Sequence, residues 1–222
     1  MSNTFIIIVL TILNYFFGSI SSAIIISKYI KKVDIRKIGY KTAGGSNVAH
    51  NIGIKWGIVV AIFDVLKGLP ILLITKNIGL EGNELIPIAL AAFAGHCWPI
   101  WFNFSGGRGI GTLLGIIVFL TPKLSIPPVI IFAMTFIPSL LKKLNIINLR
   151  IISSPTMTLL AIVVYIYITM ATEQLFDTIL GVSLLFLVLF RRITARIYEY
   201  KTYNPFKLFF SRLLFDNSEV IK

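Results

Sequence analysis

Seven long apolar runs constrain this chain more than any other feature of its sequence. They cover roughly residues 4–27, 56–75, 85–104, 109–122, 126–141, 155–172 and 177–190. Such runs are typical of membrane-crossing helices, because about 20 residues span the hydrocarbon core of a bilayer. Only 14% of the 222 residues are charged, against about 25% in a soluble domain. The sequence therefore predicts an all-α, polytopic membrane protein, with seven transmembrane helices in a single domain over residues 1–222.

The basic residues lie mainly on one side of the predicted bundle. Of the 21 Lys and Arg residues, 18 fall in the alternate loops 28–55, 105–108, 142–154 and 191–222. The positive-inside rule places these loops in the cytoplasm, which puts the N-terminus outside and the C-terminus in the cytoplasm. The tail 191–222 is basic and aromatic, which favours a segment lying on the inner leaflet. Membrane topology thus accounts for the net charge of +12, and we expect no nucleic-acid partner.

Metal and disulfide chemistry find little support in the sequence. Cys97 is the single cysteine, so no intrachain disulfide is possible, and the only histidines are His50 and His96. A metal-dependent phosphotransferase needs clustered carboxylates, which the basic loops lack. We therefore expect neither a metal site nor a cofactor.

Three polar segments stand out, all on the predicted cytoplasmic side. The first comprises residues 17–22 and 33–39 and then the glycine-rich residues 44–48, and its glycines allow consecutive N–H groups to face an anion. Residues 105–109 read Ser-Gly-Gly-Arg-Gly and lead into an apolar run, a pattern that suits a phosphate at a helix start. Residues 149–155 combine Arg150 and Ser153 with a Ser-Pro pair. The alternatives are a polar loop, a tight turn with Arg108 as a membrane anchor, and a helix start capped by Ser154.

Two charged residues lie inside the second apolar run. Asp64 and Lys67 are spaced i, i+3, so a helix places them on one face. An intramembrane carboxylate is a functional candidate. The alternative is a mutual ion pair packed inside the bundle.

Taken together, these segments resemble the PlsY family of bacterial acyl-phosphate:glycerol-3-phosphate acyltransferases. The residues that carry the resemblance are Gly18-Ser19-Ile20, Asp34-Ile35-Arg36-Lys37-Ile38-Gly39, Gly44, Ser46-Asn47-Val48, Asp64-Val65-Leu66-Lys67-Gly68, Gly95-His96, Pro99, Phe102, Phe104, Gly106 to Thr112, Arg150 and Ser153. The segment from Gly106 to Thr112 is the most specific of them.

The resemblance implies a multi-pass enzyme of the bacterial plasma membrane with its active site on the cytoplasmic side. It implies transfer of a fatty acyl group from acyl phosphate to the 1-hydroxyl of glycerol 3-phosphate, giving lysophosphatidic acid for phospholipid synthesis. The expected partners are these two substrates and membrane lipid, without a cofactor.

The resemblance and the residue chemistry together give candidate site residues. The catalytic candidates are Ser153, His96 and Asn47. The substrate-binding candidates are Ser19, Gly44, Ser46, Gly106, Gly107, Arg108, Gly109, Thr112 and Arg150. We expect Arg108 with its neighbouring glycines to hold the phosphate of glycerol 3-phosphate. We expect Gly44, Ser46 and Asn47 to hold acyl phosphate or the developing oxyanion, Arg150 and Ser153 to complete the polar wall, and His96 to orient the second loop or assist a proton transfer.

Several positions depart from the family pattern. His50 stands where the family has arginine, and Arg108 where it has lysine. The family's C-terminal His, Asn, Gly and Glu correspond here to Phe190, Ile193, Tyr200 and Thr202. These departures leave open a non-catalytic homologue that binds lipid precursors, and a small-anion transporter is a further alternative.

Overall fold

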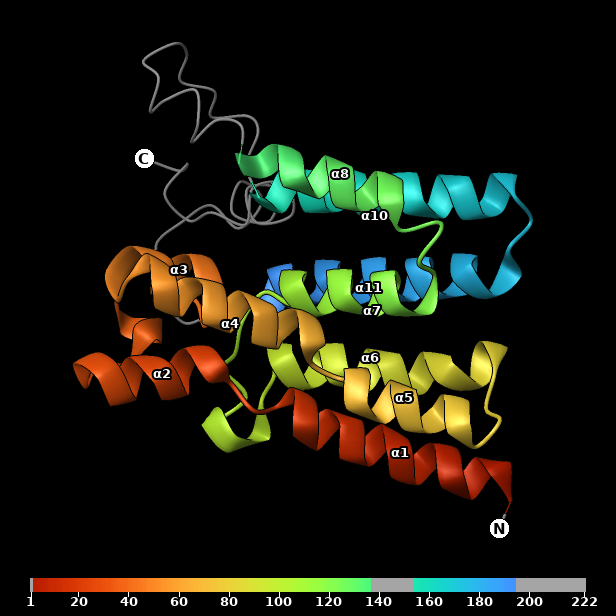
Figure 1. The fold of residues 1–222 in the computed structure, drawn as a ribbon, viewed down its shortest axis with the longest axis horizontal. Helices are drawn as coiled ribbons and strands as arrows, with labels where there is room; N and C mark the ends of the chain where they lie inside the picture. The colour runs from red at the N-terminus through yellow and green to blue at the C-terminus, as the bar shows by residue number, and fades with distance from the viewer. Residues whose placement is uncertain (1, 137–153, 195–222) are drawn as a thin grey trace. The chain divides into compact units, whose positions relative to one another are not determined.

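The computed structural model describes residues 2–136 and 154–194 (Figure 1). Every regular element in these ranges is an α-helix or a 3-10 helix, which confirms the all-α prediction. The chain divides into two compact units, Met1–Leu120 and Thr121–Lys222. A single domain over residues 1–222 stays a prediction.

The first unit holds seven α-helices and three short 3-10 helices. Their bounds are α1 Asn3–Gly18, α2 Ser22–Lys31, η1 Ile35–Lys37, α3 Gly45–Asn51, α4 Ile54–Leu66, α5 Leu69–Asn77, η2 Gly82–Glu84, α6 Leu85–Cys97, η3 Ile100–Phe102 and α7 Ile110–Leu120. The helix α3 lies within residues 28–55, which the sequence analysis treated as a loop.

Two of the predicted continuous spans are in fact pairs of helices. The run 4–27 is interrupted after Gly18, where the Ser19 hydroxyl donates to the Tyr15 carbonyl. The run 56–75 is interrupted at Lys67, whose backbone is extended, and at Gly68, whose φ is +83°. A single helix was therefore wrong for both runs, because hydropathy reports apolar length and not whether the backbone stays helical.

Small residues allow α1 and α6 to pack closely (Figure 1). A Cβ on Gly18 would meet the backbone of Ala92, and one on Gly95 would overlap the Tyr15 carbonyl. Close backbone approach through small residues is typical of helix packing in membranes. This contact holds the C-terminal end of α6, which leads into the second glycine-rich segment, against the end of α1.

Large apolar side chains remain exposed along the outer helices. On α1 they include Phe5, Ile8 and Ile12, and on α4 Ile58 and Ile62. Within residues 2–136 and 154–194, three helical stretches are long and apolar enough to cross a membrane by length and composition, namely Asn3–Lys31, Ile54–Thr75 and Gly82–Phe102. Ile110–Leu120 and Pro155–Ala171 are shorter apolar helices.

The described part of the second unit contains α8 Ile126–Ala133, η4 Met134–Phe136, α10 Ser154–Ala171 and α11 Leu175–Thr194. Its core includes Tyr165, whose hydroxyl lies 3.0 Å from that of Thr121. The buried Arg192 on α11 donates to the Pro155 carbonyl at the start of α10. The rest of the run 126–141, and the tail beyond residue 194, lie outside the described residues.

Candidate active site

The first glycine-rich segment follows a loop that apolar side chains fasten to the bundle. Ile35 and Ala43 are fully buried in a cluster with Ile24, Val48 and Val60. Burying side chains of this size stabilises the loop by about 1.5–3 kcal/mol for each large residue. This packing keeps the polar residues between Ile35 and Ala43 at the end of the helices.

The side chain of Asn47 stabilises this loop by hydrogen bonds to its backbone. Its Nδ2 donates to the carbonyls of Ile35 at 2.9 Å, Thr42 at 2.9 Å and Ile38 at 3.2 Å. Its Oδ1 accepts from the backbone N–H of Tyr40 at 2.9 Å. The side chain is buried and directed into the loop backbone, so these contacts support a positioning role for Asn47.

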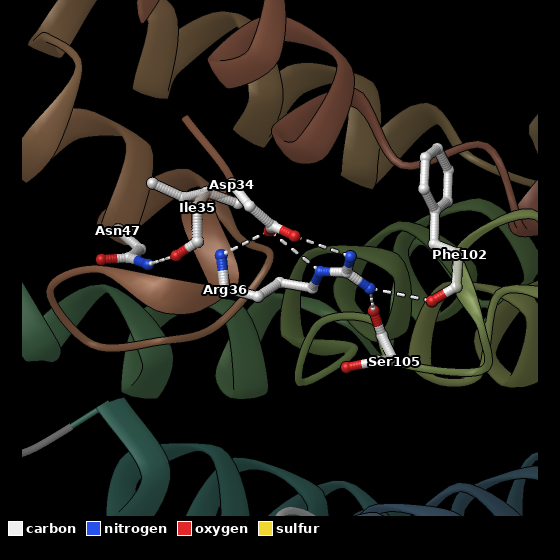
Figure 2. A network of polar contacts seen from close by, with 6 residues as sticks. All are labelled: Asp34, Ile35, Arg36, Asn47, Phe102 and Ser105. Carbon is white, nitrogen blue, oxygen red and sulfur yellow. Dashed lines mark hydrogen bonds and ion pairs between the residues drawn. The ribbon is translucent and has the colours of Figure 1, made fainter. Parts of the chain in front are cut away.

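Arg36 connects two loops of the site (Figure 2). The first loop, residues 32–44, lies between α2 and α3, and the second loop, residues 98–109, lies between α6 and α7. Its Nη1 donates to the carbonyl of Phe102 at 2.8 Å and to that of Ser105 at 3.1 Å. On the other side, its Nε and Nη2 donate to the two carboxylate oxygens of Asp34 at 3.0 and 2.8 Å. A bidentate pair of this kind fixes the plane of the guanidinium. The Arg36 hydrogen bonds hold the pKa of the Asp34 carboxyl below its ordinary value.

The second glycine-rich segment packs against the end of α6. The N–H of Gly106 donates to the Cys97 carbonyl at 3.2 Å, and the N–H of Gly107 donates to the His96 carbonyl at 3.1 Å. These two amides satisfy carbonyls that a helix C-terminus leaves without intrahelical partners. A Cβ on Gly106 would overlap the His96 carbonyl oxygen, and one on Gly107 would overlap the His96 ring.

Arg108 lies between this packed turn and α7. Its side chain is half-buried, and Gly109 after it has a φ of +80°, a conformation that favours glycine. A Cβ on Gly109 would also overlap the Phe93 ring. The first turn of α7 follows directly, and the first N–H groups of a helix have no intrahelical acceptor. Arg108 and the start of α7 therefore lie together at the point where the sequence predicts a phosphate.

Asp64, Lys67 and His96 form a buried charged cluster, which contacts the second loop at Gly107. The Nζ of Lys67 is 3.2 Å from Oδ1 of Asp64, and His96 Nδ1 is 3.4 Å from the same oxygen. Lys67 Nζ is also 3.2 Å from His96 Nδ1. The three side chains are all buried. The predicted ion pair between Asp64 and Lys67 is thus confirmed, and His96 joins it from another helix.

The remaining predicted residues of the first unit occupy different environments. Ser46 is exposed at the start of α3, and Gly44 before it has extended backbone with open space around the position of a Cβ. Ser19 is buried at the break after α1, where its hydroxyl accepts from the Ile100 N–H at 3.4 Å. The buried Thr112 hydroxyl on α7 has no hydrogen-bond partner in the part of the chain that the structure describes.

Two predicted site residues, Arg150 and Ser153, lie outside the described residues. Their roles stay predictions. Within residues 2–136 and 154–194, no group of three or more His, Cys, Asp and Glu side chains is placed to hold a metal ion.

The sequence analysis missed Arg36 as a residue that connects the two loops. Its pairing with Asp34 two residues earlier was a visible local signal. The acceptors on Phe102 and Ser105 are backbone carbonyls more than 60 residues away, and backbone carbonyls leave no trace in a sequence. The meeting of His96 with Lys67 was missed for a similar reason, since 29 residues separate them.

Comparison with known proteins gives a consistent set of matches. The family model described as "Glycerol-3-phosphate acyltransferase" matches residues 8–199. The chain is 41% identical over 108 residues to "Glycerol-3-phosphate acyltransferase 4" of Dehalococcoides mccartyi (strain CBDB1), which covers 49% of this chain and 47% of that protein. It is 38% identical over 121 residues to the glycerol-3-phosphate acyltransferase of Fusobacterium nucleatum, covering 54% of this chain and 62% of that one. The chain thus spans about half the length of the curated relatives it matches.

Solved structures show the same fold. The crystal structure of PlsY (YgiH), an integral membrane glycerol 3-phosphate acyltransferase, in its glycerol 3-phosphate form, matches with a TM-score of 0.71 and 25% identity. That match covers 84% of this chain and 88% of the other. The lysophosphatidic acid form matches with a TM-score of 0.68 and 23% identity, which bears on the fold alone. Together with the apolar helices, these matches identify the fold as that of an integral membrane protein.

Proposed function

The chain belongs to the glycerol-3-phosphate acyltransferase family, and on that premise we propose that it makes lysophosphatidic acid. The acyl group passes from acyl phosphate to the 1-hydroxyl of glycerol 3-phosphate. The new bond joins the acyl carbon to the hydroxyl oxygen, and the bond from the acyl carbon to the phosphate oxygen breaks. Inorganic phosphate leaves with the electron pair, and the hydroxyl proton passes to phosphate or solvent.

One observation carries the proposal. Arg36 ties the loop before Asn47 to the loop before Arg108, so the two glycine-rich segments form one polar end of the first unit. Both substrates carry a phosphate, and acyl phosphate is already an activated acyl donor. A site for this reaction therefore has mainly to orient two anions and a fatty chain.

The geometry refines which groups would hold each substrate. The N–H groups of Gly106 and Gly107 already donate to α6 carbonyls, so the phosphate of glycerol 3-phosphate is assigned to Arg108, Gly109 and the first turn of α7, which begins at Ile110. Gly44 and Ser46 face open space or solvent, which suits the approach of acyl phosphate. Asn47 acts through the loop that it holds. Arg150 and Ser153 are proposed to close the polar wall.

The membrane arrangement belongs to the same proposal. Seven spans, an external N-terminus and a cytoplasmic C-terminus would place both glycine-rich loops and 18 of the 21 basic residues on the cytoplasmic side of the plasma membrane. Substituted-cysteine labelling in intact cells tests this topology. A cysteine introduced at exposed Lys41 is expected to resist membrane-impermeant reagents, and one at exposed Lys123 to react with them.

The activity is tested with purified protein, an acyl phosphate and radiolabelled glycerol 3-phosphate. Labelled lysophosphatidic acid is expected with acyl phosphate and not with acyl-CoA. Arg108→Ala is expected to lower kcat/KM by about 100-fold, as for loss of a charge that orients a substrate. Lys123→Ala is the control, since it also removes one cation but from an exposed position in the other unit. Product formation that Arg108→Ala leaves intact would contradict the assigned phosphate site.

A second candidate function is a homologue that binds lipid precursors without turnover. Phe190 stands where the family has histidine, and its ring stacks on Phe186 with centroids 6.2 Å apart. An apolar stacked ring supplies no proton donor or acceptor. Folded protein that binds glycerol 3-phosphate in calorimetry, yet forms no product from acyl phosphate, would establish this second function.

A further inference from the structure

The contacts of His96 with Lys67 and Asp64 determine which nitrogen of its ring carries a proton. The Nδ1 of its ring faces two charged groups, Lys67 Nζ at 3.2 Å and Asp64 Oδ1 at 3.4 Å. Its Nε2 lies on the other side of the ring, against Gly107, because a Cβ there would overlap it. One ring nitrogen therefore faces a buried ion pair, and the other faces the turn that precedes Arg108.

The two contacts at Nδ1 demand opposite proton positions. A lysine ammonium can only donate, so a contact with Lys67 requires Nδ1 to be an acceptor without a proton. A carboxylate can only accept, so a contact with Asp64 requires a proton on Nδ1. The Lys67 contact is the shorter of the two, and the Asp64 oxygen already receives a bond from Lys67 at 3.2 Å.

Charge balance excludes a ring protonated on both nitrogens, and the Lys67 ammonium at Nδ1 then favours the first arrangement. Ionised Asp64 and Lys67 cancel each other, and a neutral His96 keeps this buried cluster at zero net charge. Protonating His96 as well would place a second cation 3.2 Å from the ammonium, with side chains that are 1% and 5% exposed. Unbalanced charge in such a place is strongly unfavourable.

We propose that Lys67 and Asp64 are positioning residues that fix neutral His96 with its proton on Nε2. The ring then presents an N–H donor to the turn at Gly107, beside Arg108. His96 is thus a permanent hydrogen-bond donor on the phosphate-binding side of the site, and it does not act as a general base. The functional part of this inference rests on the proposed function, whereas the proton position does not.

The proton position is measured by ¹⁵N NMR of protein labelled at histidine and purified in detergent. The chain has two histidines, and His50→Gln identifies the signal of His96. The expected pattern is a protonated Nε2 and an unprotonated Nδ1. A proton on Nδ1, with or without one on Nε2, would overturn the proposal, and this test needs no change near the cluster.

Two matched variants then test which residue sets the proton. Lys67→Met removes the donor and leaves Asp64, so the proton is expected to move to Nδ1. Asp64→Asn breaks the same ion pair but leaves the lysine, so the proton is expected to stay on Nε2. Both variants lose one charge of a buried pair, and a purely structural role would affect them alike. If the proton of His96 remains on Nε2 in folded Lys67→Met protein, the positioning role of Lys67 is contradicted.

Activity provides the readout at the site. A glutamine amide can donate from nearly the same place as Nε2, but it cannot accept a proton from a substrate hydroxyl. His96→Gln is therefore expected to keep kcat within about tenfold, whereas His96→Ala falls by about 100-fold or more. Equal losses in both variants would contradict the donor role. Lack of any product from unaltered protein would instead sink the proposed function, while the NMR result would still stand.

Discussion

The two glycine-rich loops of the site are similar in composition and are held by different forces. Side-chain hydrogen bonds stabilise the first loop: Asn47 donates to its backbone carbonyls, and Arg36 donates to the carbonyl of Phe102 in the second loop. The second is held by close packing, because a Cβ on Gly106 or Gly107 would overlap the end of α6. Gly44, in the first loop, has nothing within 4 Å of that position. Gly106 and Gly107 therefore mark close contact in the second loop, whereas Gly44 marks open space in the first.

The largest effect is expected from adding a methyl group to the packed loop. In Gly106→Ala the new Cβ would overlap the His96 carbonyl oxygen and lie 2.5 Å from Cδ of Pro99. Backbone atoms there cannot move aside, so overpacking should lower the free energy of unfolding by about 1–3 kcal/mol. The new methyl group should also displace the nearby Arg108, which should lower kcat by about 100-fold. Thermal unfolding in detergent and product formation measure the two effects, and a fully active variant would refute the packing argument.

A smaller effect on kcat is expected from removing the polar support of the first loop, because Asn47 acts on the site only through the loop backbone. Asn47→Ala leaves the carbonyls of Ile35 and Thr42 and the N–H of Tyr40 without this partner. Each unsatisfied buried group costs about 1–3 kcal/mol, reduced where water reaches it. Stability and kcat should therefore fall together. If kcat falls while the unfolding temperature stays unchanged, Asn47 acts directly on substrate, and the positioning role is wrong.

Acid is expected to weaken the first loop through Asp34. The pKa of this carboxyl is lowered in the fold from an ordinary value of 3.8, chiefly by hydrogen bonds from Arg36. Its contribution to stability is therefore complete above pH 3.8 and is lost as the pH falls through the folded value. The gap in unfolding temperature between the unaltered protein and Asp34→Asn should be widest near neutral pH and close in stronger acid. A constant gap would show that the charge of Asp34 contributes nothing.

The smallest effect on stability is expected at the open position of the first loop. Gly44 has φ −153° and ψ 164°, which alanine adopts readily, and a Cβ there meets no atom within 4 Å. Gly44→Ala should change the free energy of unfolding by less than about 0.5 kcal/mol. If acyl phosphate approaches there, its KM should rise severalfold at unchanged kcat. An unchanged KM would remove Gly44 from the substrate-binding residues, and a loss of stability would show that its surroundings are closed.

The apolar helices could be predicted from the sequence, whereas their interruptions could not. Each of the seven apolar runs contains an α-helix in its described residues, because a long apolar segment satisfies its backbone in lipid by forming a helix. The break at Lys67 and Gly68 depends on where tertiary contacts draw the lysine, which pairs with Asp64 and His96. Arg36 looked like one loop cation among many, because the Phe102 and Ser105 carbonyls that it binds come from a distant loop.

The sequence by itself determined that this chain is an all-helical membrane protein, since apolar run length is a local property that the bilayer selects directly. It also determined the family, because the order and spacing of short motifs such as Gly106 to Thr112 are written in the chain. Only the tertiary structure decided which glycines pack, which amides are already bonded, and which nitrogen of His96 faces the ion pair. These properties depend on distances between residues far apart in the chain, and a one-dimensional pattern does not contain them.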